Sequence, residues 1–407
     1  MMLRKRYLFT LLLLLGSLLS SSCWDRREIE ELGITIGMSI DSHTAQDRPN
    51  ETESKHQHKK LIPLSLTFQH VNHKIVGGGN RSNPSNQKPY LNVTSTGDTA
   101  FQILRETSTR TGRPPYFMHL KIVILGEDVA RRINMAQLLN LYLRNNEMRR
   151  TVYLTIAKGR GQDVLEAQTK NEDLPSLELL NLVNNLSKSN HIAMPISVGT
   201  ASENLATKRC FLVPRVVVHQ KEMKLAGGAV INGKTGKMLG WLSEAETAGI
   251  NLIQGSGKSE ESHVGGIIES AIEKGGEPFS FEIDKAKSRI IPQVKNGQVS
   301  FTVKVDAEGS LGEDWNLKEN AFDRAYMKKI EQATAEQIKK LIENSLQKIQ
   351  KEFQADVAGF GKKLHIRYPE VWRKLEMDWD ERFSKIPIHV EVKVQALDFA
   401  LKGKEKG

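Results

Sequence analysis

The sequence predicts an α+β protein of about three domains, in which mixed or antiparallel sheets pack against helices. Strand-like alternation and helical spacing follow each other along 24–175, and the last third combines alternating strands with one long helical pattern. A chain of 407 residues is long enough for several domains. We expect a signal peptide at 1–22, an N-terminal α/β domain at 24–175, a strand-rich middle domain at 176–255 and a C-terminal α+β domain at 256–402.

The first 22 residues have the pattern of a secretory signal. Three basic residues, 4–6, precede an apolar stretch that runs from Tyr7 to about Leu15. This stretch is shorter than the roughly 20 apolar residues that a membrane-spanning helix needs, and it fits the apolar region of a cleaved signal. The sequence therefore predicts export from the cytoplasm.

Cys23 follows three serines and stands where a bacterial lipoprotein box has its modified cysteine. Ser20 occupies the position usually held by leucine, and Leu19 lies one place earlier. An ordinary secretory signal with an incidental cysteine is the alternative interpretation. We expect Cys23 to be the first residue of the mature chain and to carry S-diacylglycerol and an N-acyl group, because two signals give stable membrane anchoring.

The region 24–175 alternates between strand and helix patterns after this cysteine. The first alternating strand starts about ten residues beyond Cys23, and ten residues reach at most about 35 Å, so the first domain should lie close to the membrane. Two polar stretches, 42–60 and 74–90, are expected to be loops. The expected strands are 34–40, 61–68, 120–125 and 151–157, and the expected helices are 99–110, one that opens at 126–128, 135–145 and 162–169.

A helix near 177–187 and a strand-rich stretch at 211–242 follow. The five residues 232–236 (NGKTG) are typical of a hairpin turn between two strands, 229–231 and 238–241. The Gly/Ser-rich stretch 254–265 is a candidate linker.

The last third predicts an antiparallel sheet with a long helix packed on one face. The pair Asn296-Gly297 is a strong hairpin signal between two alternating segments. A helical pattern then runs from Phe322 to Val357 and would be about 50 Å long. A short helix at 369–375 and a final alternating strand at 386–394 complete the domain.

Composition limits the chemistry that this chain can carry out. With only two cysteines, Cys23 and Cys210, no disulfide framework or cysteine-rich metal site is available. A net charge of +10 favours anionic partners such as nucleic acid, an acidic protein or an anionic membrane surface, although solubility alone explains a mild excess. Cys210 stands among apolar residues of an expected strand, where a buried, inert thiol is the expectation.

Four histidines form the one candidate metal cluster: His56, His58, His70 and His73. Neighbouring lysines repel a cation, and no cysteine or carboxylate completes a closed ligand set nearby. We therefore expect no metal site.

Nucleotide and nucleophile motifs are also incomplete. The glycines at 77–79 are not followed by Lys-Ser/Thr, and Gly126 resembles a dinucleotide-binding turn only weakly because the other glycines are missing. No Gly-x-Ser-x-Gly occurs. We expect a protein that is not an enzyme and that has no cofactor.

Five basic residues flank the segment around 148–160. They could form an edge that faces lipid headgroups or an acidic partner, or they could be a solvated helix end. These residues are Arg144, Arg149, Arg150, Lys158 and Arg160.

Several segments together resemble the C subunits of bacterial spore germinant receptors, the GerC-type or GerAC-type lipoproteins. The resemblance covers nearly all of the mature chain, in order. The segments are CWDRREI (23–29) with Gly33, HLKIVILGEDVAR (119–131), RNNEMRRTVYLTIAKG (144–159), LAGGAVINGKTGKMLGWLSEAETAGINLIQG (225–255), QADVAGFG (354–361), YPEVW (368–372) and Trp379.

This resemblance implies a three-domain α+β lipoprotein on the outer face of the spore inner membrane. The partners that the resemblance implies are the A-type and B-type multi-pass membrane subunits of the same receptor, and membrane lipid through the anchor. Nucleic acid is not an expected partner. The receptor responds to nutrients and starts germination. No catalytic residue or cofactor comes with the family, so a non-catalytic scaffold or coupling role is expected.

Two other function classes remain open at this point. A free-standing extracytoplasmic solute-binding lipoprotein is the main alternative, since two domains that face a cleft can bind a small ligand. A cell-wall enzyme is the third class, and the missing carboxylate and triad motifs count against it.

Overall fold

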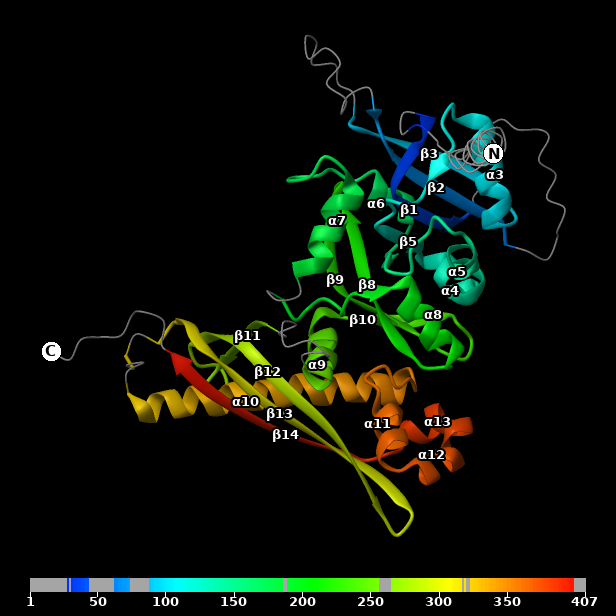
Figure 1. Ribbon diagram of the computed structural model, residues 1–407. Helices are drawn as coiled ribbons and strands as arrows, with labels where there is room; N and C mark the ends of the chain where they lie inside the picture. Colours follow the sequence, from blue (N-terminus) through cyan, green and yellow to red (C-terminus); the bar gives the residue numbers. More distant parts are fainter. Residues whose placement is uncertain are drawn as a thin grey trace, which may run out of the picture.

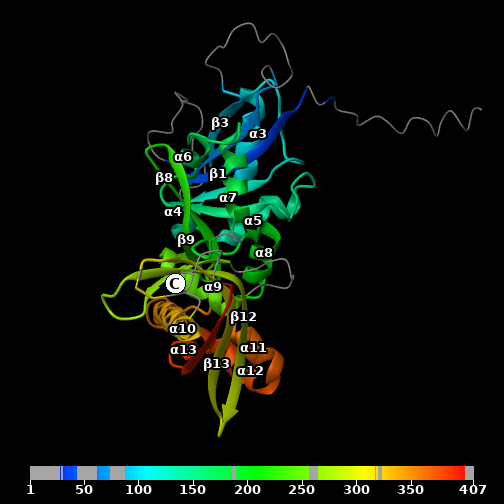
Figure 2. The ribbon, with the colours of Figure 1, turned by 90° about the vertical axis from the view of Figure 1, so that its left-hand side faces the viewer.

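The computed structural model describes residues 28, 31–43, 62–73, 88–185, 189–255, 265–316, 318–319 and 323–398. In these residues two sheets and their helices form two bodies that meet at helix α9 (Glu244–Gln254), so the predicted α+β class is confirmed (Figure 1). A view turned by 90° has the first sheet above α9 and the second sheet below it (Figure 2).

The first sheet has the strand order β10-β9-β8-β6-β5-β1-β2-β3. Its central strands β1, β5, β6 and β8 are parallel neighbours, and the outer pairs are antiparallel. Two short strands lie outside this order: β4 pairs with β1, and β7 pairs with β6. The bounds are β1 (Gly33–Ser42), β2 (Leu64–Val71), β3 (Tyr90–Gly97), β4 (Pro115–Tyr116), β5 (Ile122–Gly126), β6 (Tyr153–Ala157), β7 (Ile196–Ser197), β8 (Phe211–His219), β9 (Glu222–Ile231) and β10 (Met238–Leu242).

Both faces of the central strands are covered by helices. Strand β5 is a continuous apolar run, as expected of a parallel strand buried on two sides. Val123 and Leu125 pack with α3 (Ala100–Arg110), α4 (Glu127–Arg132), α5 (Met135–Arg144) and α8 (Val198–Ala206). Ile122 and Ile124 face the opposite way and pack with α6 (Gly161–Leu165) and α7 (Pro175–Asn184).

The strands expected in a separate middle domain continue this first sheet. Strand β8 pairs with β6, and β9 and β10 extend the sheet beyond β8. The hairpin expected around 232–236 joins β9 to β10, as predicted. Hydrogen bonding is therefore continuous from 24–175 into 176–255, while the division of the chain into three domains stays a prediction.

The second sheet has the order β11-β12-β13-β14, with bounds β11 (Gly266–Ala271), β12 (Pro278–Lys295), β13 (Gln298–Asp314) and β14 (Ile388–Asp398). The predicted turn at Asn296-Gly297 joins β12 and β13, and both residues have positive φ, 50° and 77°. The first three strands are antiparallel, as predicted. The expectation of a purely antiparallel sheet is wrong for β14, which pairs in parallel with β13.

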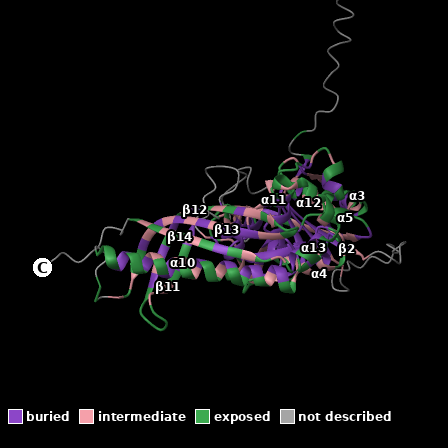
Figure 3. Ribbon diagram, turned by 90° about the horizontal axis from the view of Figure 1, so that it is seen from below, coloured by how far each residue is buried: buried purple, intermediate pink, exposed green. Residues whose placement is uncertain are grey.

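The parallel pairing of β14 follows from its long connection. Helix α10 (Arg324–Gln347) runs along the sheet after β13, and a helix between two strands brings the chain back in the same direction. Ile330, Ile338 and Ile342 of α10 are buried in one cluster with the sheet, so the predicted long helix packs on one face. Seen from below, buried and exposed positions alternate along this layer (Figure 3).

The predicted helix over 322–357 is shorter than expected. It begins after Asp323, whose side chain caps Ala325 N, and it passes into a π-helical turn, η4 (Lys348–Glu352). Short elements then lead back to the sheet: α11 (Phe360–Arg367), α12 (Pro369–Leu375), η5 (Glu376–Asp378) and α13 (Trp379–Phe383).

Helix α9 joins the two bodies. A capping box of Ser243 and Glu246 starts the helix, and all seven residues from Thr247 to Ile253 are buried. One hydrophobic cluster runs from Leu242 and Ile250 into the second sheet. Among the described residues, no helix is both long and apolar enough to span a membrane.

Candidate functional site

The residues predicted to carry function fall into separate places. Cys23, the predicted lipid-attachment residue, lies outside the described residues, and so do His56 and His58. The other two histidines, His70 and His73, each form a hydrogen bond within the first body. The buried His70 has Nδ1 3.0 Å from Thr35 Oγ1, and His73 Nε2 lies 3.1 Å from Leu32 O. Burial lowers the pKa of His70 to about 4.

Gly126 borders a buried carboxylate instead of an open phosphate pocket. A Cβ at Gly126 would lie 2.2 Å from Asp41 Oδ1. The Asp41 carboxylate accepts hydrogen bonds from Gly161 N at 2.6 Å and Gln162 N at 3.0 Å. Burial raises the pKa of Asp41, and these backbone hydrogen bonds oppose that rise. Asp41 therefore ties β1 to α6, and Gly126 is required by the close approach.

The predicted basic edge is divided between the two ends of β6. Arg149 and Arg150 precede this strand, whereas Lys158 and Arg160 follow it. The five residues of β6 span about 17 Å, so the structure does not bring the two groups together.

A groove of about 950 Å³ lies at the junction of the two bodies. On one side it is lined by the β9–β10 turn and by the start of β8, and on the other by α11, α12 and α13. The turn is built by Asn232, whose Oδ1 accepts from Lys234 N and Thr235 N at 2.9 Å each. It presents Lys234 to the second body, where Nζ lies 3.3 Å from Asp380 Oδ2.

Asp356 is a buried residue that lines this junction groove. Its carboxylate accepts from the backbone N of Gly359 (2.8 Å), Phe360 (2.9 Å) and Gly361 (2.6 Å) and from Trp379 Nε1 (2.9 Å). Burial raises the pKa of Asp356, and the four donors oppose that rise. The arrangement fixes the start of α11 against α13.

Aromatic rings pack around this carboxylate. Gly361 leaves room for two indole rings, because a Cβ there would lie 2.8 Å from both Trp372 and Trp379. The ring centroids of Trp372 and Trp379 are 5.1 Å apart, and the ring centroids of Phe360 and Phe301 of β13 are also 5.1 Å apart. The segments QADVAGFG and YPEVW with Trp379 thus form one packed unit.

Cys210 is buried in the same groove, as predicted for this thiol. Its Sγ lies 3.8 Å from Asp380 Oδ1, and burial raises its pKa to about 12. A thiol with such a pKa is protonated at neutral pH and is a poor nucleophile.

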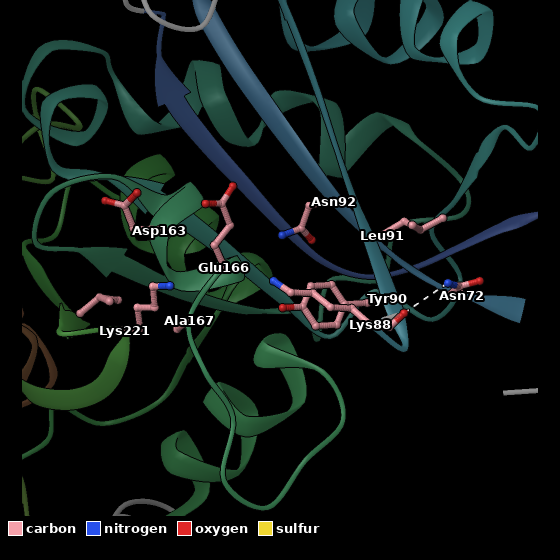
Figure 4. Close-up of a pocket in the computed structure, with 10 residues that line it drawn as sticks. Asn72, Lys88, Tyr90, Leu91, Asn92, Asp163, Glu166, Ala167 and Lys221 are labelled. Atoms are coloured by element: carbon pink, nitrogen blue, oxygen red, sulfur yellow. Dashed lines mark hydrogen bonds between the residues drawn. The ribbon is translucent and has the colours of Figure 1, made fainter. Parts of the chain in front are cut away.

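A second groove of about 920 Å³ lies at the edge of the first sheet (Figure 4). Lys88, Tyr90 and Asn92 come from the β3 side, and Asp163 and Glu166 come from α6. Acidic and basic side chains both line this groove. Burial raises the pKa of the Asp163 carboxyl, and the charge of Glu166 raises it further, while Arg160 opposes the rise.

Sequence reasoning missed Asp41, Asp356 and the junction role of Lys234. The partners of both carboxylates are backbone amides, which any sequence supplies. The one signal for Asp356 was its position just before Gly359 and Gly361, since a short acidic residue before glycines is typical of a helix start.

Comparisons with known proteins cover most of the chain. Residues 25–218 match the family described as "Spore germination protein N-terminal domain", and residues 226–399 match "Spore germination B3/ GerAC like, C-terminal".

Three curated relatives come from Bacillus subtilis (strain 168). Spore germination protein YndF is 36% identical over 93% of each chain, and spore germination protein A3 is 30% identical over 96% of this chain and 97% of its own. Spore germination protein B3 is 29% identical, over 94% of this chain and 95% of its own.

A solved structure has a similar fold. The crystal structure of the GerBC protein superposes with a TM-score of 0.59 at 25% sequence identity, over 83% of this chain and 94% of that chain.

Proposed function

The chain belongs to the spore germination B3/GerAC-like family, and from this membership we propose that it is the lipid-anchored C subunit of a nutrient germinant receptor. Its partners in this proposal are the A-type and B-type multi-pass membrane subunits of the same receptor. Its place is the outer, extracytoplasmic face of the spore inner membrane. The observation that carries the proposal is the match of 93% to 96% of this chain to spore germination proteins.

The role that we propose for this subunit is a non-catalytic scaffold or coupling component. The relatives are named for spore germination and not for a reaction. The buried carboxylate of Asp356 is fully engaged by backbone and indole donors, and the raised pKa of Cys210 disfavours a thiolate. Such groups hold elements together, and they support a rigid body that works through its outer surfaces.

The anchor in this proposal is Cys23, with S-diacylglycerol and an N-acyl chain. Gly33, the first residue of β1, comes ten residues later, which limits the distance from the lipid to the first sheet to about 35 Å. A short tether gives the subunit a high effective concentration beside integral membrane partners.

Replacement of the anchor tests the proposal in cells. Spores that carry Cys23→Ser as the sole copy should lose palmitate labelling of the protein, membrane retention and the nutrient response. Cys210→Ser is the matched control, and it should retain palmitate labelling and membrane retention. Membrane retention and nutrient response that survive in the Cys23→Ser spores would contradict the proposed anchor.

A free-standing solute-binding lipoprotein is the second candidate function. The two grooves, of about 950 Å³ and 920 Å³, are large enough to hold a small ligand, and their size is the observation that favours this candidate. A ligand that binds the native state raises the melting temperature. The receptor proposal predicts that no amino acid or sugar shifts the melting temperature of the isolated chain, and a clear shift would favour the solute binder.

A further inference from the structure

Basic residues collect at the edge of the first sheet where β1 begins. Strands β1, β5 and β6 are parallel neighbours, so their first residues lie at the same edge. Lys121 directly precedes β5, and Arg149 and Arg150 precede β6. The backbone links these positions across the sheet, since Tyr153 N donates to Lys121 O at 2.9 Å.

We name as the sheet-end basic cluster these three residues together with Arg144, the last residue of α5, from which the chain leads to β6: Lys121, Arg144, Arg149 and Arg150. All four side chains are exposed. Within the part of the chain that the structure describes, none of them has an ion pair or a side-chain hydrogen bond, whereas Arg131 and Arg132 of α4 are both paired with carboxylates. Unpaired, exposed cations at one edge are available to an anionic surface.

The local backbone holds the cluster in place. Arg150 O accepts from Gly199 N at 2.9 Å, in the first turn of α8. Glu147 is the carboxylate in the same connection, and it is half-buried with Oε2 3.3 Å from Phe117 N. The backbone at Arg150 is therefore held against α8, and the carboxylate of Glu147 is turned toward the protein.

The chain enters the fold at this same edge. Gly33 N donates to Pro114 O at 2.9 Å, next to β4, and β1 then runs away from the cluster. Only ten residues separate Gly33 from Cys23, so this edge lies within about 35 Å of an anchor at Cys23. The opposite ends of β5 and β6 lie farther from Gly33 by about the length of these strands.

We propose that the sheet-end basic cluster binds the anionic headgroups of the membrane that holds the anchor, and so orients the first body on it. This inference rests on the lipid anchor in the proposed function. Each basic residue next to an anionic bilayer strengthens binding about fivefold, and salt screens the attraction. Together with the acyl chains, the cluster limits rotation about the tether and presents a constant face to partners.

The test uses the mature chain with Cys23→Ser, so that the protein domain alone determines binding. Its co-sedimentation is compared between vesicles of phosphatidylcholine and vesicles of phosphatidylcholine mixed with phosphatidylglycerol. We expect binding to the anionic vesicles only, and we expect it to weaken as salt is added. Because no lipid is attached, this result does not depend on whether Cys23 is acylated in cells.

A charge-reversed pair locates the binding surface. Arg149→Glu with Arg150→Glu should weaken binding to anionic vesicles by at least about tenfold. Lys328→Glu with Lys329→Glu, an exposed pair on α10, makes the same charge change in the second body and should leave binding nearly unchanged. Lys121→Glu with Arg144→Glu is the second variant of the cluster, in case the first pair disturbs the fold.

Three results would overturn the inference. One is the absence of binding to anionic vesicles, which would leave an acidic protein as the partner of the cluster. Another is equal binding to neutral vesicles. The third is an equal loss in the cluster variants and the α10 variant, which would mean that net charge and not this edge determines binding.

Discussion

The burial of His70 makes the free energy of unfolding depend on pH. Its imidazole is 5% exposed, and burial lowers its pKa from 6.5 to about 4. Between these values the unfolded chain binds more protons than the native chain. The contribution to the free energy of unfolding is therefore complete above pH 6.5 and is lost as the pH falls toward about 4.

We predict that His70→Gln makes stability less dependent on pH. The difference in the free energy of unfolding between about pH 7 and about pH 5 should shrink by about 2 kcal/mol, measured by urea denaturation. His219→Gln, at the exposed end of β8, is the control and should leave the difference as it is in the unaltered chain. An unchanged pH dependence in His70→Gln would contradict the burial argument.

Asp356 has a larger structural role. Asp356→Ala would leave three backbone N–H groups and the Trp379 indole without their acceptor inside the fold. Since each unpaired buried donor costs about 1–3 kcal/mol, we expect a loss of at least about 3 kcal/mol in the free energy of unfolding.

The control for Asp356 is an exposed carboxylate. Asp306→Ala removes a surface ion pair with Arg289, which contributes little. Chemical denaturation followed by tryptophan fluorescence should separate the two variants clearly. Similar stabilities for Asp356→Ala and Asp306→Ala would show that the hydrogen bonds of Asp356 are not stabilising.

At the scale of single residues, the sequence predicts the burial of apolar side chains, but it does not predict the roles of buried polar side chains. The burial of Cys210 follows from its apolar neighbours in the chain. The roles of Asp41 and Asp356 depend on amides that lie close only after folding: Gly161 is 120 residues from Asp41 in the chain. Such distances are set by the tertiary fold and not by local pattern.

At the scale of the elements, α9 depends on a residue without a side chain. A Cβ at Gly249 would lie 2.0 Å from Ser345 Oγ and 2.5 Å from Leu341 O of α10. Gly249→Ala should therefore push the two helices apart and lower the free energy of unfolding by about 1–3 kcal/mol.

A second glycine provides the matched control for this helix contact. Gly112 has no heavy atom within 4 Å of a built Cβ, so Gly112→Ala should be tolerated. Thermal or urea unfolding measures both variants. Equal stability of the two would mean that α9 and α10 are not closely packed.

Local signals predicted many elements but not their partners. The Asn296-Gly297 turn and the long α10 follow from local chemistry and period, and both are present. The helices α8 and α9 and strand β3 were not predicted. The parallel pairing of β14 joins residues far apart in the chain, Phe301 with Ile388 for example, which periodicity cannot specify.

At the scale of the whole molecule, the two bodies share one hydrophobic core through α9. Ile250 and Ile253 belong to the same cluster as Phe281 and Val303 of the second sheet. We predict a single calorimetric unfolding transition for the mature chain, with equal calorimetric and van't Hoff enthalpies. Two separated transitions would instead mean that the bodies unfold as independent domains.

The central claim is that this chain is one subunit of a membrane receptor. The most direct measurement is a tagged pull-down from solubilised spore inner membranes, read by mass spectrometry, with an untagged strain as control. We predict recovery of two multi-pass membrane proteins in amounts comparable to the tagged chain. Recovery of the chain alone, or with soluble cell-wall proteins, would contradict it.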